Sequence, residues 1–317
     1  MMVMLEHSGQ FLYADLVSGG ANRPIWSRKQ IEQVIGYILV APLLCWMLVV
    51  LIYPIFSLLA LSLTNTRIIG APASFIAAEN YVATLQSAPF WASVARSLVW
   101  LLGNIFLGTV VALAAALLLR QSWLLARHAR VWILLPWVIP TVAVSVIWQW
   151  MLNTNYGVIN IALQHLAITS APLNIFGSRQ LAMVGVIVAN TWHWFPLSAV
   201  VMFGAMHNIP ADLYEAAQID GANSWQQFRH ITLPSIEKVL FALGLVGGLW
   251  TLNVFDTIYL ITRGGPSDAT QTLPVLIYDT AFKGQRIGLA AAMSVVAICL
   301  LAALATLYAR IAAPKEE

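Results

Sequence analysis

Charged side chains are scarce in this sequence. Asp, Glu, Lys and Arg make up 9% of its 317 residues, whereas a typical soluble domain has about 25%. Hydrophobic residues make up 60%, and the mean hydropathy is +0.79. A core built from a chain of this length needs far fewer apolar residues, so the excess must face something other than water. This composition argues against an ordinary soluble domain and is typical of a protein that crosses a membrane several times.

Other absences exclude particular functions. None of the four lysines follows a glycine, so the sequence holds no phosphate-binding P-loop. The net charge of +3 is too small to indicate a nucleic-acid partner. Cys45 and Cys299 both lie in apolar runs and have neither metal-ligand spacing nor a disulfide framework. We therefore expect no metal site and no cofactor in this chain.

Long charge-free windows predict about six membrane-spanning helices. A spanning helix needs about 20 apolar residues, and these windows are long enough to supply them. The predicted helices cover residues 36–63, 94–119, 131–152, 181–206, 238–262 and 287–311. Residues 153–178 are broken by Asn, Gly, Ser and Pro, which predicts a surface loop with a short helix. The expected fold class is an all-α integral membrane protein, with tails at residues 1–35 and 312–317.

The basic residues predict the orientation of the spans. With six spans, both termini lie on the same side as the loops at residues 120–130 and 207–237. That side carries ten of the sixteen Lys and Arg residues, and the opposite side carries six. Because short loops rich in Lys and Arg stay in the cytoplasm, we expect both termini to be cytoplasmic.

The stretch "NIPADLYEAAQIDGANSWQQFRHITLP" at residues 208–234 is polar, yet it lies between two predicted spans. Its first half is rich in helix-forming residues, and Gly221 is expected to end this helix in a left-handed conformation. Ser224, with Gln227 three residues later, matches a capping box for a second helix, which Pro234 should stop. A hairpin this small has no core of its own. Its apolar side therefore faces a partner protein or the membrane interface, and the residues alone leave both open.

The same stretch resembles the EAA loop of ABC-importer permease subunits, because "YEAAQIDGANSWQQFRHITLP" matches that motif nearly throughout. In that family the hairpin is a coupling helix. It sits in a cleft of a separate ATPase subunit and passes closure of the ATPase to the transmembrane helices. The resemblance implies that hairpin 209–234 carries the ATPase-coupling residues Glu215, Ala216, Ala217, Asp220, Gly221, Ala222, Trp225, Phe228, Leu233 and Pro234. Glu215 would contact basic groups of the ATPase, Gly221 would set the turn, and Trp225 would pack in the cleft or against the membrane.

Further stretches resemble the carbohydrate-uptake branch of these permeases, which serves maltose, trehalose and glycerol 3-phosphate. They include "LLPWVIPTVAVSVIWQWMLNTNYGVIN", "ANTWHWFPL" and "VFDTIYLITRGGPSDATQTLPVLIYDTAF", and the resemblance covers residues 36–311. It implies a permease domain in the bacterial cytoplasmic (inner) membrane that moves a sugar or sugar derivative by alternating access. The implied partners are a second permease subunit, two ATPase subunits that bind ATP and Mg, and an extracytoplasmic solute-binding protein. A non-sugar small solute is the alternative cargo.

Five residues within the predicted spans are candidates for the substrate path: Asn190, Trp194, Asn253, Asp256 and Tyr259. Amide and aromatic groups suit sugar hydroxyls, although helix packing is the alternative role for each of them. Asp256 is the one acidic residue within a predicted span, whereas an ion-coupled secondary transporter needs several such charges. The spans also hold no constellation of nucleophile and acid–base groups. The sequence therefore predicts a transport subunit rather than an enzyme, with an ion-coupled transporter as the weaker alternative.

Overall fold

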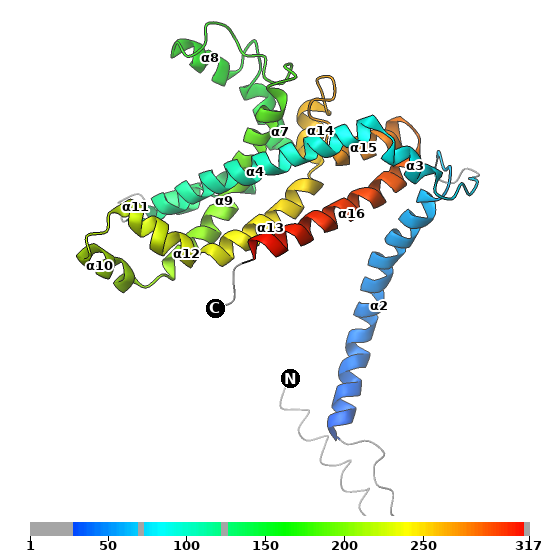
Figure 1. Cartoon of the computed structure of the whole chain (residues 1–317), viewed down its shortest axis with the longest axis horizontal. Coiled ribbons are helices and arrows are strands. Elements are labelled where there is room, and N and C mark those ends of the chain that lie inside the picture. Colours follow the sequence, from blue (N-terminus) through cyan, green and yellow to red (C-terminus); the bar gives the residue numbers. More distant parts are fainter. Residues whose placement is uncertain (1–27, 69–72, 122–125, 314–317) are drawn as a thin grey trace, which may run out of the picture. The chain divides into compact units, whose positions relative to one another are not determined.

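The computed structural model describes residues 28–68, 73–121 and 126–313 of the chain (Figure 1). Within these ranges the regular elements are helices, together with one isolated bridge between Thr64 and Phe75. The chain divides into two units, Met1–Ser57 and Leu58–Glu317.

The described part of the first unit is a single long helix, α2 (Arg28–Ser62), which runs to the boundary of the unit and a few residues beyond. It begins before residue 36, so it extends into the predicted N-terminal tail. Pro42 and Pro54 lie inside it. Its segment Gln33–Ser62 is long and apolar enough to cross a membrane.

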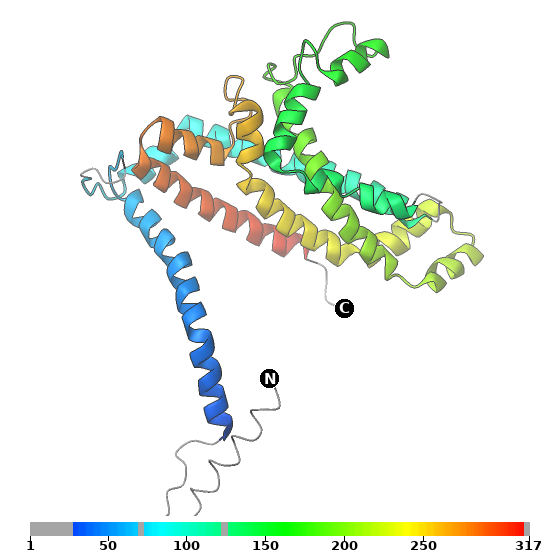
Figure 2. The same ribbon diagram turned by 180° about the vertical axis from the view of Figure 1, so that it is seen from behind.

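Four long helices form the body of the second unit (Figures 1 and 2). They are α4 (Ala88–Arg120), α9 (Ala182–His207), α13 (Glu237–Asn253) and α16 (Ile287–Ala312). α4 starts at a proper cap, because the hydroxyl oxygen of Ser87 accepts a hydrogen bond from the amide of Phe90. The predicted spans at 94–119, 181–206 and 287–311 are thereby confirmed as continuous helices, each longer than predicted at one end or both.

Two predicted spans are not single helices. Residues 131–152 contain the end of α5 (Ala126–Trp132), α6 (Leu135–Val138) and α7 (Thr141–Met151), with a 94° bend before α7. Pro136 and Pro140 explain the interruptions, since proline lacks the amide that would continue a helix. The span at 238–262 is interrupted after α13, and α14 (Asp256–Thr262) follows. In the described ranges four helices can cross a membrane unaided, or up to six if each bent pair counts as one span.

The short elements gather at one end of the second unit, opposite the end where α10 lies (Figure 1). They are α3 (Glu79–Leu85), α14, α15 (Leu273–Tyr278) and the π-helix η2 (Asp279–Lys283). The predicted surface loop is confirmed and contains α8 (Val158–His165). The side-chain amide of Gln149 in α7 donates to the carbonyl oxygens of Leu260 and Ile261, at 2.7 and 2.8 Å. These bonds fix α7 against the end of α14.

The start of α16 packs closely on the chain that follows α2. The amide of Gly288 donates to the Thr66 carbonyl at 2.9 Å. The side chain of Asn80 donates to the carbonyls of Ser62 and Thr64, at 2.9 and 2.8 Å. A Cβ atom on Gly288 would collide with the Thr64 carbonyl oxygen. Only glycine therefore permits this approach.

We expect Gly288→Ala to lower the free energy of unfolding by about 1–3 kcal/mol, because the new methyl group collides with backbone that Asn80 holds in place. The measurement is the thermal unfolding midpoint of the purified protein in detergent. Gly204→Ala is the control, since a Cβ there meets open space on α9. Equal midpoints for the two variants would contradict this account of the α16 contact.

Candidate functional site

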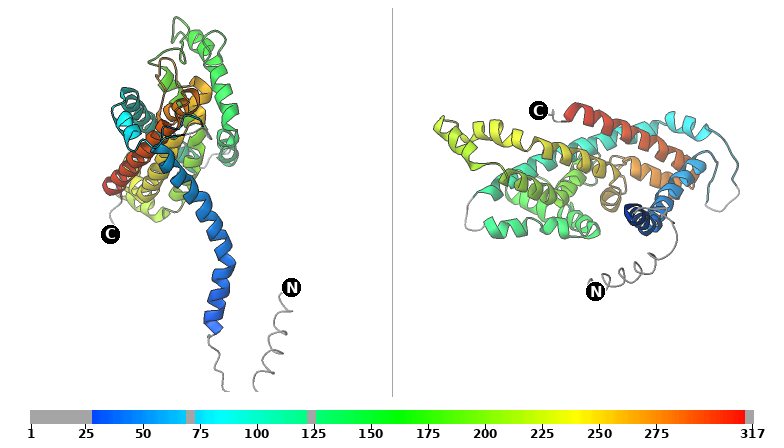
Figure 3. Two further views of the ribbon diagram at one scale, coloured as in Figure 1. Left: turned by 90° about the vertical axis from the view of Figure 1, so that its right-hand side faces the viewer. Right: turned by 90° about the horizontal axis from the view of Figure 1, so that it is seen from below.

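The polar stretch at 209–234 forms the predicted hairpin. Its first helix is α10 (Ala211–Ile219), and its second half runs through α11 (Ser224–Gln227), the π-helix η1 (Phe228–Thr232) and α12 (Leu233–Ser235). The view from below in Figure 3 shows α10 and α11 at the far end of the second unit. The hairpin is thus presented away from the short elements around α14.

The turn of the hairpin depends on glycine, as predicted. Gly221 has a φ of +80°, in the left-handed region. Its amide donates to the carbonyl of Gln218, and the amide of Ala222 donates to the carbonyl of Ala217 at 2.8 Å. This pair of bonds is the Schellman arrangement that closes the end of a helix.

The predicted capping box lies one residue earlier than expected. Asn223 is the N-cap: its side chain accepts from the amide of Gln226, and the Gln226 side chain accepts from the amide of Asn223. Ser224 is the first helical residue, and Gln227 instead donates its side-chain amide to the Ala222 carbonyl. Asparagine caps a helix as well as serine does, which explains the shift in register.

Pro234 does not stop the second helix, contrary to the prediction. The preceding turn widens into the π-helix η1, in which the amide of Leu233 donates to the carbonyl of Phe228. This wider turn absorbs the proline, and helical structure continues to Ser235. A 63° bend then separates this helix from α13. Ile236 lies at the bend and is 0% exposed, packed in a cluster with Ala116, Met202 and Met206.

The tip of the hairpin exposes apolar side chains to the surroundings. Ile219 is 87% exposed and Trp225 is 65% exposed, and the Trp225 ring lies 5.4 Å from the Phe228 ring. Glu215, Ala216, Asp220, Gly221 and Pro234 are also exposed, whereas Ala217, Ala222, Phe228 and Leu233 are half-buried. A concave surface of about 330 Å³ lies between the two helices, lined in part by Ala217, Ala222 and His230. An exposed apolar tip with a hollow beside it is typical of a surface that a partner covers.

A second candidate site lies among the long helices. It is a cavity of about 270 Å³ between α4, α9 and α13. Its polar and aromatic lining residues include Asn104, Asn190, Thr191, Trp194, Ser198, Trp250 and Thr251. The side-chain amide of Asn190 donates to the Asn104 oxygen at 2.8 Å, and that of Asn104 donates to the Trp100 carbonyl at 2.8 Å.

This cavity carries polar atoms with no partner among the described residues. The Asn190 side-chain oxygen and the Thr191 hydroxyl are buried and without a hydrogen bond in that part of the chain. Buried polar atoms are normally satisfied, so these two atoms in the cavity wall are exceptions. The rings of Trp194 and Trp250 stand at the cavity 6.2 Å apart. Amide groups beside indole rings provide what a sugar hydroxyl and a sugar face require.

The five substrate-path candidates do not form one site. Asn190 and Trp194 line the cavity between α4, α9 and α13, whereas Asn253 lines a different pocket. Asp256 is exposed and accepts a hydrogen bond from the amide of Thr257. Tyr259 belongs to an aromatic cluster with Phe255, Tyr278 and Phe282. Asn104, Thr191, Trp250 and Thr251 were not among the predicted site residues, although Asn104 is an amide inside a charge-free run.

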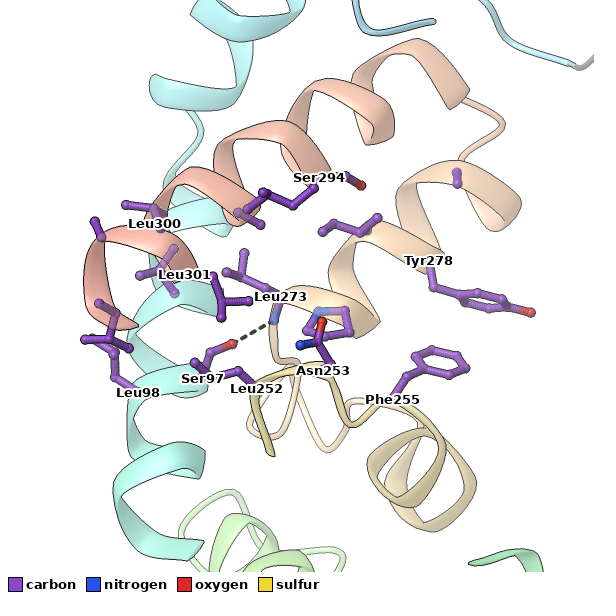
Figure 4. Close-up of a pocket in the computed structure, with 18 of the residues that line it drawn as sticks. Ser97, Leu98, Leu252, Asn253, Phe255, Leu273, Tyr278, Ser294, Leu300 and Leu301 are labelled. Carbon is purple, nitrogen blue, oxygen red and sulfur yellow. Dashed lines mark hydrogen bonds between the residues drawn. The ribbon is translucent and has the colours of Figure 1, made fainter. Parts of the chain in front are cut away.

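The pocket that contains Asn253 is larger, about 730 Å³, and mostly apolar. Figure 4 shows leucines of α4 and α16 on one side of it, with Asn253, Phe255 and Tyr278 on the other. The Ser97 hydroxyl in this pocket already accepts the amide of Leu273 at 2.9 Å. Such a lining offers few groups to a sugar and suits an apolar occupant instead.

Charged side chains near the short elements pair with each other. Lys283 lies 2.7 Å from Asp279, and its ammonium also stands 5.2 Å from the centre of the Tyr259 ring. The hydrogen bond to Asp279 raises the pKa of Lys283. Within the described ranges, no three His, Cys, Asp or Glu side chains come close enough to hold a metal ion.

Comparison with known proteins gives one consistent answer. The family described as "Binding-protein-dependent transport system inner membrane component" matches residues 104–315. Trehalose/maltose transport system permease protein MalF of Thermococcus litoralis is 30% identical over 283 residues, which are 89% of this chain and 95% of that protein. Diacetylchitobiose uptake system permease protein DasB of Streptomyces coelicolor is 32% identical over 241 residues, 75% and 74% of the two chains.

The fold also has a counterpart among solved structures. A chain of a bacterial alginate ABC transporter, in complex with an alginate pentasaccharide-bound periplasmic protein, superposes with a TM-score of 0.78. It is 21% identical and covers 92% of this chain and 98% of its own. The match to the family spans the cavity and the hairpin. The chain therefore belongs to the family of inner membrane components of binding-protein-dependent transport systems.

Proposed function

We propose that this chain is the permease subunit of an ATP-driven importer that carries a sugar or sugar derivative across the bacterial inner membrane. The observation that carries this proposal is the exposed hairpin at 209–234, which joins α9 and α13, two of the helices that line the cavity. The sugar class rests on the cavity, which is lined by amide and hydroxyl side chains as well as by indole rings. Relatives named for trehalose, maltose, diacetylchitobiose and alginate support the same class.

The proposed complex contains two ATPase subunits, which bind ATP and Mg, and a solute-binding protein outside the cell. The exposed tip of the hairpin, with Ile219 and Trp225, would enter a cleft on one ATPase. Glu215 is exposed on the same helix and is free to pair with a basic group of that partner. This chain has no P-loop of its own, so another polypeptide must supply the energy.

A second permease subunit would complete the solute path. The cavity of this chain is bounded by α4, α9 and α13, while Trp194 and Trp250 remain exposed at its open side. A path through a membrane must be enclosed by protein, because open polar surface is costly in hydrocarbon. We infer that a second, similar chain faces these two tryptophans. Closure of the ATPase pair would then move the hairpins and open the path alternately to each side.

Both termini are proposed to be cytoplasmic, on the side of the hairpin. The C-terminal half of α16 lies beside the start of α13, since the Tyr308 ring stacks on Phe241 at 5.4 Å. The hairpin joins that same end of α13 at Ile236. The N-terminus is assigned to this side from the distribution of basic residues alone.

Glu215→Ala and Gly221→Pro are each expected to lower uptake at least about tenfold. The first removes a charge-assisted contact, and the second forces a φ of +80° onto proline. The measurement is uptake by cells from a panel of labelled oligosaccharides, together with co-purification of the ATPase and the amount of permease in the membrane. Glu237→Ala is the control, because this exposed acid lies outside the hairpin. Normal uptake in both variants, at normal membrane levels, would refute the docking role of the hairpin.

Asn190→Leu is expected to lower uptake about tenfold without loss of the ATPase, because it removes an amide from the cavity lining together with its hydrogen bond to Asn104. Uptake is measured with the same oligosaccharide panel. Ser145→Ala is the matched control, since Ser145 is a buried polar side chain of α7 that bonds to the Thr141 carbonyl. If Asn190→Leu takes up every sugar at the wild-type rate, the cavity is not the solute path.

A fluorescent protein fused after Glu317 should fold and fluoresce, whereas alkaline phosphatase at that point should be inactive. Fusions of the chain truncated after Ser178 should give the opposite pair, because the loop at 153–178 is assigned to the outer side. Phosphatase activity after Glu317 would overturn the proposed orientation.

A further inference from the structure

The first helix of the hairpin, α10, has little contact with the rest of the described chain. Seven of its nine residues are exposed, and the remaining two, Tyr214 and Ala217, are half-buried. The turn after it contains Gly221, around which a Cβ would meet open space. A helix with so few buried residues is held in place mainly by the side chains that still contact its neighbours.

Tyr214 makes that tie to two other elements. Its hydroxyl shares a hydrogen bond of 2.8 Å with the hydroxyl of Thr232, which is 2% exposed in η1. Its ring lies under the guanidinium group of Arg120, at 4.2 Å from the ring centre. Arg120 is the last residue of α4. One side chain therefore connects the first hairpin helix, the π-helix and a long helix of the body.

We propose that Tyr214 is the positioning residue that passes movement of α10 to the walls of the cavity between α4, α9 and α13. This inference rests on the proposed role of the hairpin as the docking site for an ATPase. The hydrogen bond to Thr232 makes α10 and η1 move together, and the contact with Arg120 carries the movement to α4. Without Tyr214 these two contacts are lost, so movement of α10 is no longer carried to η1 and α4.

Both receiving elements lead to the cavity. Arg120 and Asn104 lie on the same helix, about 24 Å apart along its axis, and Asn104 lines the cavity. Thr232 leads through the buried Ile236 into α13, which carries Trp250 and Thr251 on another wall. A long helix with satisfied backbone bonds moves as a rigid body, so displacement at one end appears at the other. Tyr214 thus acts on two of the three helices that bound the cavity.

The test uses the complete complex with its ATPase and binding protein. Cys45 and Cys299, which are exposed, are first replaced by serine. Ser198 lines the cavity and is replaced by cysteine as a reporter. The rate at which a maleimide labels Ser198→Cys is measured before and after the complex is trapped with Mg, ATP and vanadate. The probe is the trapped nucleotide, so the solute need not be known.

In the background with native Tyr214 and Arg120, trapping should change the labelling rate. Tyr214→Leu and Arg120→Gln should each reduce that change about two- to fivefold, the range expected for loss of an exposed cation–π contact. The double variant should respond as Tyr214→Leu does, because Arg120→Gln breaks one of the two connections that Tyr214→Leu already breaks. Arg120→Lys keeps the positive charge and should restore most of the response. Tyr214→Phe keeps the ring and should lose only the part carried through Thr232.

A merely structural role would lower the unfolding midpoint of these variants. The proposed role instead leaves the unfolding midpoint and the amount of trapped nucleotide at the values of the background with native Tyr214 and Arg120. Arg229→Gln, at an exposed basic residue of η1, is the control and should respond normally. A full response in both Tyr214→Leu and Arg120→Gln would overturn the inference. So would a weak response that Arg120→Lys fails to restore and that comes with a lower unfolding midpoint.

The outcome also separates this inference from the proposed function. If the chain with native Tyr214 and Arg120 binds no ATPase, the docking role and this inference both fail. If that chain is trapped and responds, and the variants respond equally, the docking role stands and only the part given to Tyr214 is wrong.

Discussion

The packing of α4 against α9 is the interaction on which the second unit depends. Ala112, Ala116 and Ala199 are all 0% exposed at this contact, so the two backbones approach closely. Lipid tails are as apolar as leucine, and helices in a membrane therefore associate through small residues and interhelical hydrogen bonds. The bond between Asn190 of α9 and Asn104 of α4 is such an interhelical hydrogen bond. The pair forms a rigid frame that fixes one wall of the cavity relative to the next.

α13 is attached to this frame at two points, and the attachments explain how the hairpin reaches the cavity. The indole nitrogen of Trp100 donates to the carbonyl of Thr251 at 2.8 Å, near the cavity. At the other end, Ile236 is buried against residues of α4 and α9 just after the hairpin ends. Between these points α13 carries Gly244, Gly247 and Gly248, at a cost in helix propensity. The helix is thus attached at both ends, and the cavity runs along it between these two points.

Much of this arrangement could be predicted from the sequence, because membrane spans are recognisable as long charge-free runs. The turn at Gly221 was also predictable, since few other residues adopt a positive φ. The breaks at Pro136 and Pro140 were missed because proline inside a membrane helix is sometimes tolerated and sometimes not. Pro234 was misjudged for a related reason: a π-turn supplies the spare residue that accommodates it. Neither outcome is visible without the neighbouring helices.

The site was harder to predict than the fold, because hydrophobic periodicity fails when a helix is apolar all round. Asn190 and Asn253 are the same residue type at similar positions in their predicted spans, yet they line different cavities. What distinguishes them is the partner: Asn190 bonds across to Asn104, whereas Asn253 bonds back to the Leu249 carbonyl of its own helix. A polar side chain that reaches another helix fixes the register between the two, and Asn190 does so while it is only 3% exposed. The scarcity of charge in the chain has the same origin, since polar groups persist where protein meets protein, solute or water rather than lipid.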